Sequence, residues 1–297
     1  MNRAAFCVLL MIFTLLYLSC HNRQDKYSSE ENQVFLSWDT KPQKQPKVNL
    51  IEAEQRLPKG AFPWGGTVSH HLLAGELIDE WFLKLKQARD VDLFYVLSPS
   101  HWNLSIYDYS LTDGSWKTNN GLVLSDKTKV NKLAGILNTP LEHHVFKYEH
   151  GVSTLTPYIK KHFPEAKVVV IAYNGEPPID MKKTEKLGRA MKKMFSPKTA
   201  KKQNAFLLVS TDFSHHGNFS KIAENDARTR KYLSSLNPDS WTLVICDNRP
   251  AIYLISKFST ENTKCTIQHA TTAYELTDET DSADITSYFF TYFWEDE

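Results

Sequence analysis

The sequence predicts an α/β sandwich built around one sheet. Three short, continuous apolar runs are typical of buried strands, and stretches with apolar residues at the helical spacing lie between and after them. Such an alternation places helices over the faces of a sheet. Residues 60–297 contain no internal repeat and no linker, so we expect a single domain there.

The expected elements follow in chain order. Apolar residues at Leu73, Leu77, Ile78, Trp81, Phe82 and Leu85 predict a helix within residues 72–88. The continuous apolar runs predict strands at 93–97, 168–172 and 205–209. Helical spacing predicts helices at 178–195, 222–236 and 251–258. Segment 241–246 resembles a strand, and alternating aromatic and polar residues at 285–294 are typical of another.

Composition and charge exclude several classes of protein. The 297 residues include 35 Lys and Arg against 34 Asp and Glu, a net charge of +1. This balance gives no general attraction to nucleic acid, so we expect no nucleic-acid partner. A hydrophobic content of 41% argues against wholesale disorder. Four cysteines are too few for a fold held together by disulfides.

The N-terminus has the pattern of an export signal. Arg3 precedes an apolar run over residues 4–18, which is shorter than the roughly 20 residues of a membrane span. We therefore expect a signal peptide over residues 1–19. Ser19 before Cys20 resembles the lipobox of bacterial lipoproteins, although Tyr17 stands where leucine is usual. Cys20 is thus the expected lipidation site of an exported, membrane-anchored protein. Ordinary signal cleavage and an uncleaved anchor are the alternatives.

The next segment, residues 20–59, is polar and is expected to be a tether to the domain at 60–297. Two cysteines, Cys246 and Cys265, remain in that domain. They could pair in an oxidising compartment, or one of them could be a ligand.

Polar clusters follow the predicted strands. Ligands and catalytic groups collect at the carboxyl ends of strands in open α/β sheets. The clusters are Ser69-His70-His71, Ser98-Pro99-Ser100-His101, Ser210 to His216 and Ile245-Cys246-Asp247, with Glu149-His150-Gly151 as a fifth. Imidazole and thiolate ligands suit zinc, iron or copper. None of the clusters is a self-contained metal motif, and Cys246 could simply be a small buried apolar residue.

In their order and spacing these clusters resemble the Memo family, whose bacterial and archaeal members are called AmmeMemoRadiSam system protein B. That family has P-H-A-G, G-P-S-H, E-H-S, S-S-D-F-x-H and I-C-G-R-H-P segments in this order. The tail Asp281-Ser282-Ala283-Asp284 is similar to its S-x-D segment. The resemblance covers roughly residues 60–294.

The resemblance implies a single-domain α/β sandwich with a central mixed sheet, similar to class III extradiol dioxygenases. It also implies an iron or copper ion held by His70, His101 and Cys246. Asp212, His215 and His150 fall on the family's other site positions and are expected to orient ligands or move protons. Radical S-adenosylmethionine and AMMECR-type proteins are the partners that the family name implies.

The sequence departs from the family around the expected ligands. Ser69 replaces a proline, and Cys246-Asp247-Asn248-Arg249-Pro250 replaces C-G-R-H-P. The function expected is a metal-dependent oxidoreductase acting on an unknown small molecule. A non-enzymatic, membrane-anchored binding module and a metal-dependent hydrolase are the alternatives.

Overall fold

The computed structural model describes residues 33–41, 48–49, 51–175, 178–277 and 280–296. The expected signal peptide and Cys20 lie outside these residues. Residues 34–297 form one folded unit. Among the described residues, no helix combines the length and the apolar character that crossing a membrane requires.

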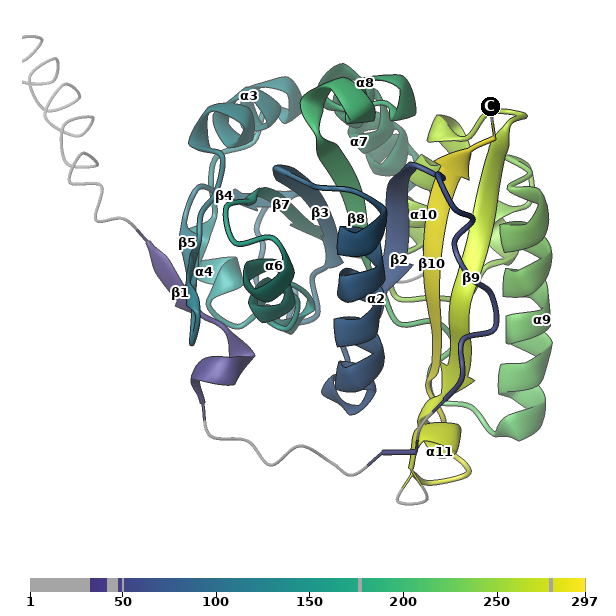
Figure 1. Ribbon diagram of the computed structural model, residues 1–297. Coiled ribbons are helices and arrows are strands. Elements are labelled where there is room, and N and C mark those ends of the chain that lie inside the picture. Colours follow the sequence, from purple (N-terminus) through teal and green to yellow (C-terminus); the bar gives the residue numbers. More distant parts are fainter. Residues whose placement is uncertain (1–32, 42–47, 50, 176–177, 278–279, 297) are drawn as a thin grey trace, which may run out of the picture. The chain divides into compact units, whose positions relative to one another are not determined.

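In the described part of the chain, a seven-stranded mixed sheet lies at the centre of this unit (Figure 1). The strands in spatial order are β4 (Ser110–Thr112), β7 (Lys167–Tyr173), β3 (Leu93–Pro99), β8 (Ala205–Ser210), β2 (Pro63–Val68), β10 (Ser287–Glu295) and β9 (Thr263–Thr272). The four strands β7, β3, β8 and β2 run parallel, and β4 and β10 run antiparallel to their neighbours. The carboxyl ends of the four parallel strands therefore meet along one edge.

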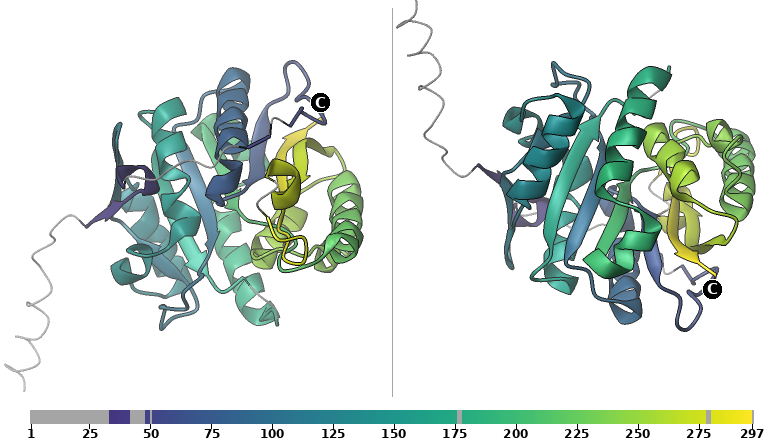
Figure 2. Two further views of the ribbon diagram at one scale, coloured as in Figure 1. Left: turned by 90° about the horizontal axis from the view of Figure 1, so that it is seen from below. Right: turned by 90° about the horizontal axis from the view of Figure 1, so that it is seen from above.

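Helices cover both faces of the sheet (Figure 2). One apolar core contains side chains of α3 (Lys127–Leu137), α7 (Met181–Met194), α8 (Pro197–Gln203), α9 (Phe219–Ser235) and α10 (Arg249–Phe258). The other contains side chains of α2 (Gly75–Ala88), α4 (His143–Phe146), α5 (His150–Ser153), α6 (Thr156–His162) and α11 (Ala273–Leu276). Successive residues of β3, such as Phe94 and Tyr95, point into opposite cores. The predicted α/β sandwich is confirmed.

Most of the expected elements are present with small changes in their ends. The helix expected within 72–88 consists of a 3-10 turn, η3 (Leu72–Ala74), and α2. The helices expected at 178–195, 222–236 and 251–258 are α7, α9 and α10. The C-terminal strand is β10, and the three apolar runs are β3, β7 and β8.

The strand predicted at 241–246 is wrong. Its first residues form a 3-10 turn, η4 (Trp241–Leu243), followed by a loop. The guanidinium of Arg249 donates hydrogen bonds to the carbonyls of Val244 (2.8 Å) and Thr242 (2.6 Å). These carbonyls are therefore satisfied by a side chain instead of a neighbouring strand, which explains how an apolar segment remains outside the sheet.

Part of the segment expected to be a tether is folded onto the domain. Strand β1 (Val34–Leu36) pairs with β5 (Ser115–Thr118), which also pairs with β6 (Gly121–Val123). The ring of Phe35 is buried 5.3 Å from that of Trp116. A 3-10 turn, η2 (Trp38–Thr40), follows β1. Apolar anchors at Phe35 and Trp38 thus hold a segment whose overall composition is polar.

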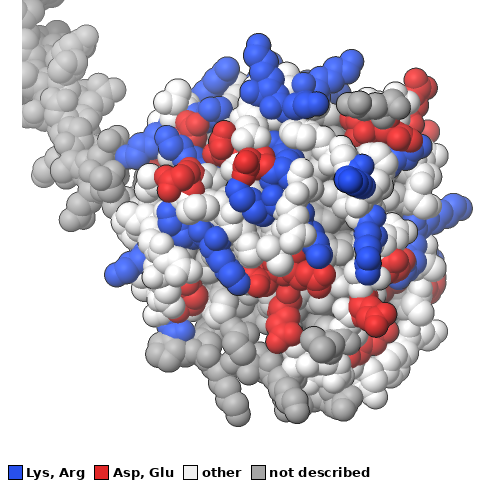
Figure 3. All heavy atoms as spheres, viewed as in Figure 1, with Lys and Arg blue, Asp and Glu red and all other residues white. Residues whose placement is uncertain are grey.

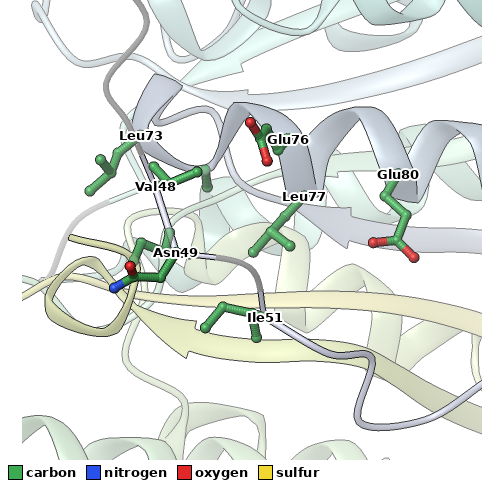
Figure 4. A pocket seen from close by; sticks show the side chains of 9 residues that line it. Val48, Asn49, Ile51, Leu73, Glu76, Leu77 and Glu80 are labelled. Carbon is green, nitrogen blue, oxygen red and sulfur yellow. The ribbon is translucent and has the colours of Figure 1, made fainter.

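A second stretch of the same segment lies against α2. Val48 and Ile51 approach Leu73 and Leu77, with which they line a small cavity of about 130 Å³ (Figure 4). The backbone N–H of Asn49 donates to the carbonyl of Leu276 at 2.8 Å. This cavity contains Glu76 and Glu80 but none of the expected metal ligands.

Basic and acidic side chains are interspersed on the face shown in Figure 3. Basic side chains gather near the top of the view, and acidic ones lie among them elsewhere. This mixed face agrees with the nearly balanced composition of the chain.

The approach of β2 to β10 depends on Gly66. A Cβ atom at this position would collide with the carbonyl oxygen of Thr291 and lie 2.7 Å from the indole of Trp81. We expect Gly66→Ala to lower the free energy of unfolding by about 1–3 kcal/mol or more, because the backbone must shift. Gly135→Ala in α3 is the control, because a Cβ there meets nothing within 4 Å. It should raise stability by about 0.4–1 kcal/mol. Denaturant unfolding measures both, and equal effects would contradict this account.

Candidate metal centre

His70 lies just beyond the end of β2 and is buried. Its Nδ1 lies 2.9 Å from the hydroxyl of Ser210 at the end of β8. That hydroxyl donates its proton to the carbonyl of Gly151 at 2.6 Å, so it accepts from Nδ1–H of His70. In a neutral imidazole this tautomer leaves a lone pair on Nε2.

His101 follows β3 and is held by Glu149. The backbone N–H of His101 donates to Oε2 of Glu149 at 2.9 Å, and Nδ1 lies 2.6 Å from Oε1. The same carboxylate accepts from the N–H of Gly151 at 2.8 Å. A Cβ on Gly151 would collide with Oγ of Ser98 and lie 3.1 Å from Oε1 of Glu149, so this glycine permits the close packing. The Nε2 atom of His101 is thereby directed away from Glu149.

Asp247 lies in the loop before α10 and is buried. Its Oδ1 accepts from the hydroxyl of Thr211 at 2.7 Å and from the N–H of Asp212 at 3.2 Å. Among the described residues its Oδ2 has no hydrogen-bond partner, although it is buried. This oxygen lies 3.2 Å from Nε2 of His70 and 3.7 Å from Nε2 of His101.

The three side chains therefore present their free ligand atoms to one another. In each case the second polar atom is fixed by another residue, which is the usual way that proteins orient metal ligands. A buried carboxylate oxygen without a hydrogen bond is costly unless a cation or another donor meets it. Two imidazoles and one carboxylate form a complete facial ligand set for a transition metal. In the described residues, two overlapping groups of converging ligand atoms could hold a metal ion: His70, His101 and His150, and His70, Asp212 and Asp247.

Electrostatics ties these groups together in the absence of a metal. Burial by itself would lower the pKa of His101, but the neighbouring carboxylates of Asp247 and Glu149 outweigh it and raise that pKa to about 10. Burial would also lower the pKa of His70, and the charges of Asp212 and Asp247 raise it. The pKa of Asp247 is held well below its usual range by both imidazoles, against its burial. Protons thus occupy the place that a metal would take.

His150 joins the same cluster from the start of α5. Its ring lies 3.8 Å from that of His101 and 5.4 Å from that of His70, and the ligand atoms of the three lie within 4.8 Å of one another. Burial and the neighbouring imidazolium charges lower its pKa to about 4. His150 is therefore neutral near pH 7 and able to accept a proton.

Asp212 lies at the site, and His215 lies beside it. Oδ1 of Asp212 accepts from the hydroxyl of Ser69 at 2.5 Å, and Oδ2 lies 3.7 Å from Nε2 of His70. His215 is half-buried, and among the described residues its buried Nε2 has no hydrogen-bond partner. Its charge lowers the pKa of Asp247, but its ring does not join the groups of converging ligand atoms in the described chain.

Cys246 is placed differently from the expectation. Its side chain is buried within the apolar core that contains Val244 and Tyr173. Burial, together with the charge of Asp247, raises the pKa of its thiol to about 12. In the described part of the chain, Cys246 is absent from the groups of converging ligand atoms, whereas Asp247 belongs to one. Cys246 and Cys265 are both free thiols, so the structure contains no bridge between them.

Three residues that build the site have roles that their motifs do not reveal. Asp247 lies beside the expected thiolate, and Glu149 and Ser210 belong to the polar clusters that follow the strands. A carboxylate directly beside the expected ligand was the available signal for Asp247. The remaining histidines contact other groups: His71 bonds Tyr288 (2.6 Å), and His162 bonds Asp79 (2.7 Å).

Comparison with known proteins gives the family. The family model described as Memo-like protein matches residues 68–284, well over half of the chain. The chain belongs to the Memo-like family. It is 24% identical over 204 residues to a MEMO1 family protein of Pyrobaculum aerophilum, covering 66% of this chain and 65% of that one. It is 18% identical over 218 residues to a MEMO1 family protein of Caldivirga maquilingensis, covering 71% and 72%.

A cavity opens onto the metal centre of this Memo-like chain. It has a volume of about 520 Å³ and is lined by His70, His150 and Asp212 at one end. Its size falls within the range of small-molecule sites. The larger cavity of about 800 Å³, between residues 51–61 and α2, contains none of the metal-centre residues.

Glu149 supplies the test of how the centre is held. Hydrogen bonds and the charge of His101, together with N–H groups of Gly151 and His101, lower the pKa of Glu149 against its burial. In metal-free protein near pH 7, Glu149→Gln should lower the free energy of unfolding by about 1.5–3 kcal/mol, because charged hydrogen bonds are lost. The exposed Glu185→Gln is the control and should change stability by less than about 0.5 kcal/mol.

The effect of Glu149→Gln should depend on pH. Because the folded-state pKa lies below the ordinary value of 4.5, the carboxylate stabilises fully above that value and its contribution is lost as pH falls through the folded-state pKa. Denaturant titrations over a pH series should therefore show the gap to the wild type closing in acid. A gap that widens in acid would contradict the assignment.

Proposed function

We propose that this Memo-like protein is a metal-dependent oxidoreductase that holds non-haem iron between His70, His101 and Asp247 and acts on a small molecule. One observation carries the proposal: Nε2 of both histidines lies within 3.7 Å of the same buried carboxylate oxygen of Asp247. Two histidines and one carboxylate with open positions are typical of iron(II) oxygenases. The ligand set favours iron over the copper ion that a thiolate would accommodate.

The chain's own residues have distinct tasks in this proposal. Ser210 and Glu149 hold the imidazoles, and Thr211 holds Asp247, so the ligand atoms are oriented before a metal arrives. Iron bound there supplies open coordination positions and redox chemistry. His150, neutral near pH 7, accepts a proton from a substrate in the adjoining cavity. Asp212 accepts a hydrogen bond from Ser69, and this bond keeps the negative charge of its carboxylate beside His70.

Metal analysis tests the ligand assignment. The purified wild type, loaded with iron(II) without oxygen and freed of excess metal, should retain about one equivalent by elemental analysis. Asp247→Asn and the double variant His70→Ala, His101→Ala should lose at least about tenfold in affinity. Cys246→Ser should retain iron, because the thiol lies in the core. Iron retained by Asp247→Asn and lost by Cys246→Ser would overturn the assignment in favour of the thiolate.

Nitric oxide tests for open coordination positions. Iron(II) protein exposed to nitric oxide should give the half-integer-spin electron paramagnetic resonance signal of an iron nitrosyl, because three protein ligands leave room for it. His150→Gln should still give the signal, since His150 is not assigned as a ligand. Failure to form the adduct despite full iron loading would favour the non-enzymatic binding module.

The expectations that concern location and partners stay predictions. They are export with a lipid anchor at Cys20, and association with radical S-adenosylmethionine and AMMECR-type proteins. Cys20 lies outside the described residues. Fractionation of cells that express Cys20→Ser, compared with the wild type, tests the anchor directly.

A further inference from the structure

The cavity at the metal centre has a wall that the N-terminal segment supplies. Leu36, Ser37, Trp38 and Lys41 line it together with Leu72, Lys147 and Tyr148, opposite the end occupied by His70, His150 and Asp212. The lining of this cavity thus combines apolar and aromatic side chains, two lysines and residues of the candidate metal centre.

The wall is firmly attached to the domain. The hydroxyl of Ser37 is buried and lies 2.6 Å from that of Thr156, and the N–H of Ser37 donates to the carbonyl of Lys117 at 3.0 Å. The indole N–H of Trp38 donates to the carbonyl of Thr154 at 2.9 Å. Burial of Phe35 against Trp116 holds the preceding strand. The segment is therefore a preformed surface of the cavity.

The two lysines at this cavity carry charge that no carboxylate neutralises within the described residues. Neither Lys41 nor Lys147 belongs to an ion pair there, and Lys147 lies 5.4 Å from the centroid of the Tyr148 ring. A different cavity near Tyr109 also contains a lysine, Lys183, but that lysine is paired with Asp108 at 2.7 Å. Unpaired lysines at the mouth of an apolar cavity attract an anion.

We propose that the cavity binds a small organic acid with an apolar or aromatic body. Its carboxylate is recognised by Lys41 and Lys147, its body packs against Trp38, Leu36 and Leu72, and its other end reaches His150 and the metal centre. This substrate class rests on the proposed function, because the cavity is defined by its opening onto the metal ligands. Its volume of about 520 Å³ accommodates a molecule of that kind.

A pair of probes that differ only in charge tests the proposal. Phenylacetate and phenylacetamide share a body, and only the acid is anionic near pH 7. Binding to the full-length protein is followed by ligand-detected saturation-transfer nuclear magnetic resonance and by tryptophan fluorescence. The wild type should bind phenylacetate more tightly than phenylacetamide, and added salt should reduce the difference.

Matched variants separate the charge from the apolar wall. Lys41→Gln with Lys147→Gln should weaken phenylacetate binding about fivefold and leave phenylacetamide binding unchanged. The control, Lys132→Gln with Lys192→Gln, removes the same charge from exposed positions on α3 and α7. It should leave both affinities unchanged. Trp38→Ala should weaken both probes to a similar degree.

The outcomes distinguish this proposal from the proposed function. Equal binding of acid and amide, or equal losses in the two lysine double variants, would overturn the substrate class. Iron retention by Asp247→Asn would overturn the metal centre while leaving the probe result intact. Measured on metal-free and iron-loaded protein alike, the lysine effect should appear in both, since Lys41 and Lys147 do not bind the metal.

Discussion

The side chain of Asn248 fixes the loop on which the metal centre depends. Its amide donates to the carbonyls of Leu97 (3.1 Å) and Ser210 (2.8 Å), and its oxygen accepts from the hydroxyl of Tyr173 (2.7 Å). These partners lie in β3, β8 and β7, so one buried amide ties the loop to the carboxyl ends of three parallel strands. With Asn248 fixed, Asp247 has little freedom and faces the histidines that follow β2 and β3. Gly175 leaves room for this loop, because a Cβ there would collide with the carbonyl of Asp247.

Hydrogen bonds around that loop orient the side chains of the candidate metal centre. Ser210, Glu149 and Thr211 each satisfy one polar atom of a ligand residue and leave another free. A protein interior seldom tolerates a free carboxylate oxygen, and this one is buried beside two imidazole nitrogens. Shared protons balance the charges when no metal is present, which explains the opposite pKa shifts of His101 and Asp247. Hydrogen bonds with Ser210, Glu149 and Thr211 thus orient the ligand atoms toward one another.

The sequence predicted the sandwich and singled out His70 and His101, but it did not single out Asp247, the carboxylate that lies beside them. Continuous apolar runs reveal β3, β7 and β8 because those strands are buried on both faces, whereas β9 alternates with many polar residues and lacks that signal. A shift of one residue along the loop before α10 decides whether Cys246 or Asp247 faces the histidines. Asn248 fixes this loop through carbonyls that lie far along the chain, at Leu97 and Ser210, and no local pattern encodes those contacts. The folded part of the expected tether was hidden for a similar reason, because its few apolar anchors find partners far along the chain.

The family model matches some of the residues around the candidate metal centre and leaves others outside its range. The match covers residues 68–284, which include His70, His101, Glu149 and Asp247. Leu36, Trp38 and Lys41 precede it, although they form a wall of the cavity that opens onto those ligands. The candidate metal ligands therefore lie within the part of the chain that the family model matches, and part of the lining of the adjoining cavity lies outside it. A segment attached through β1 can change its side chains without disturbing the sheet edge, since its own contacts are with β5 and the loops around α6.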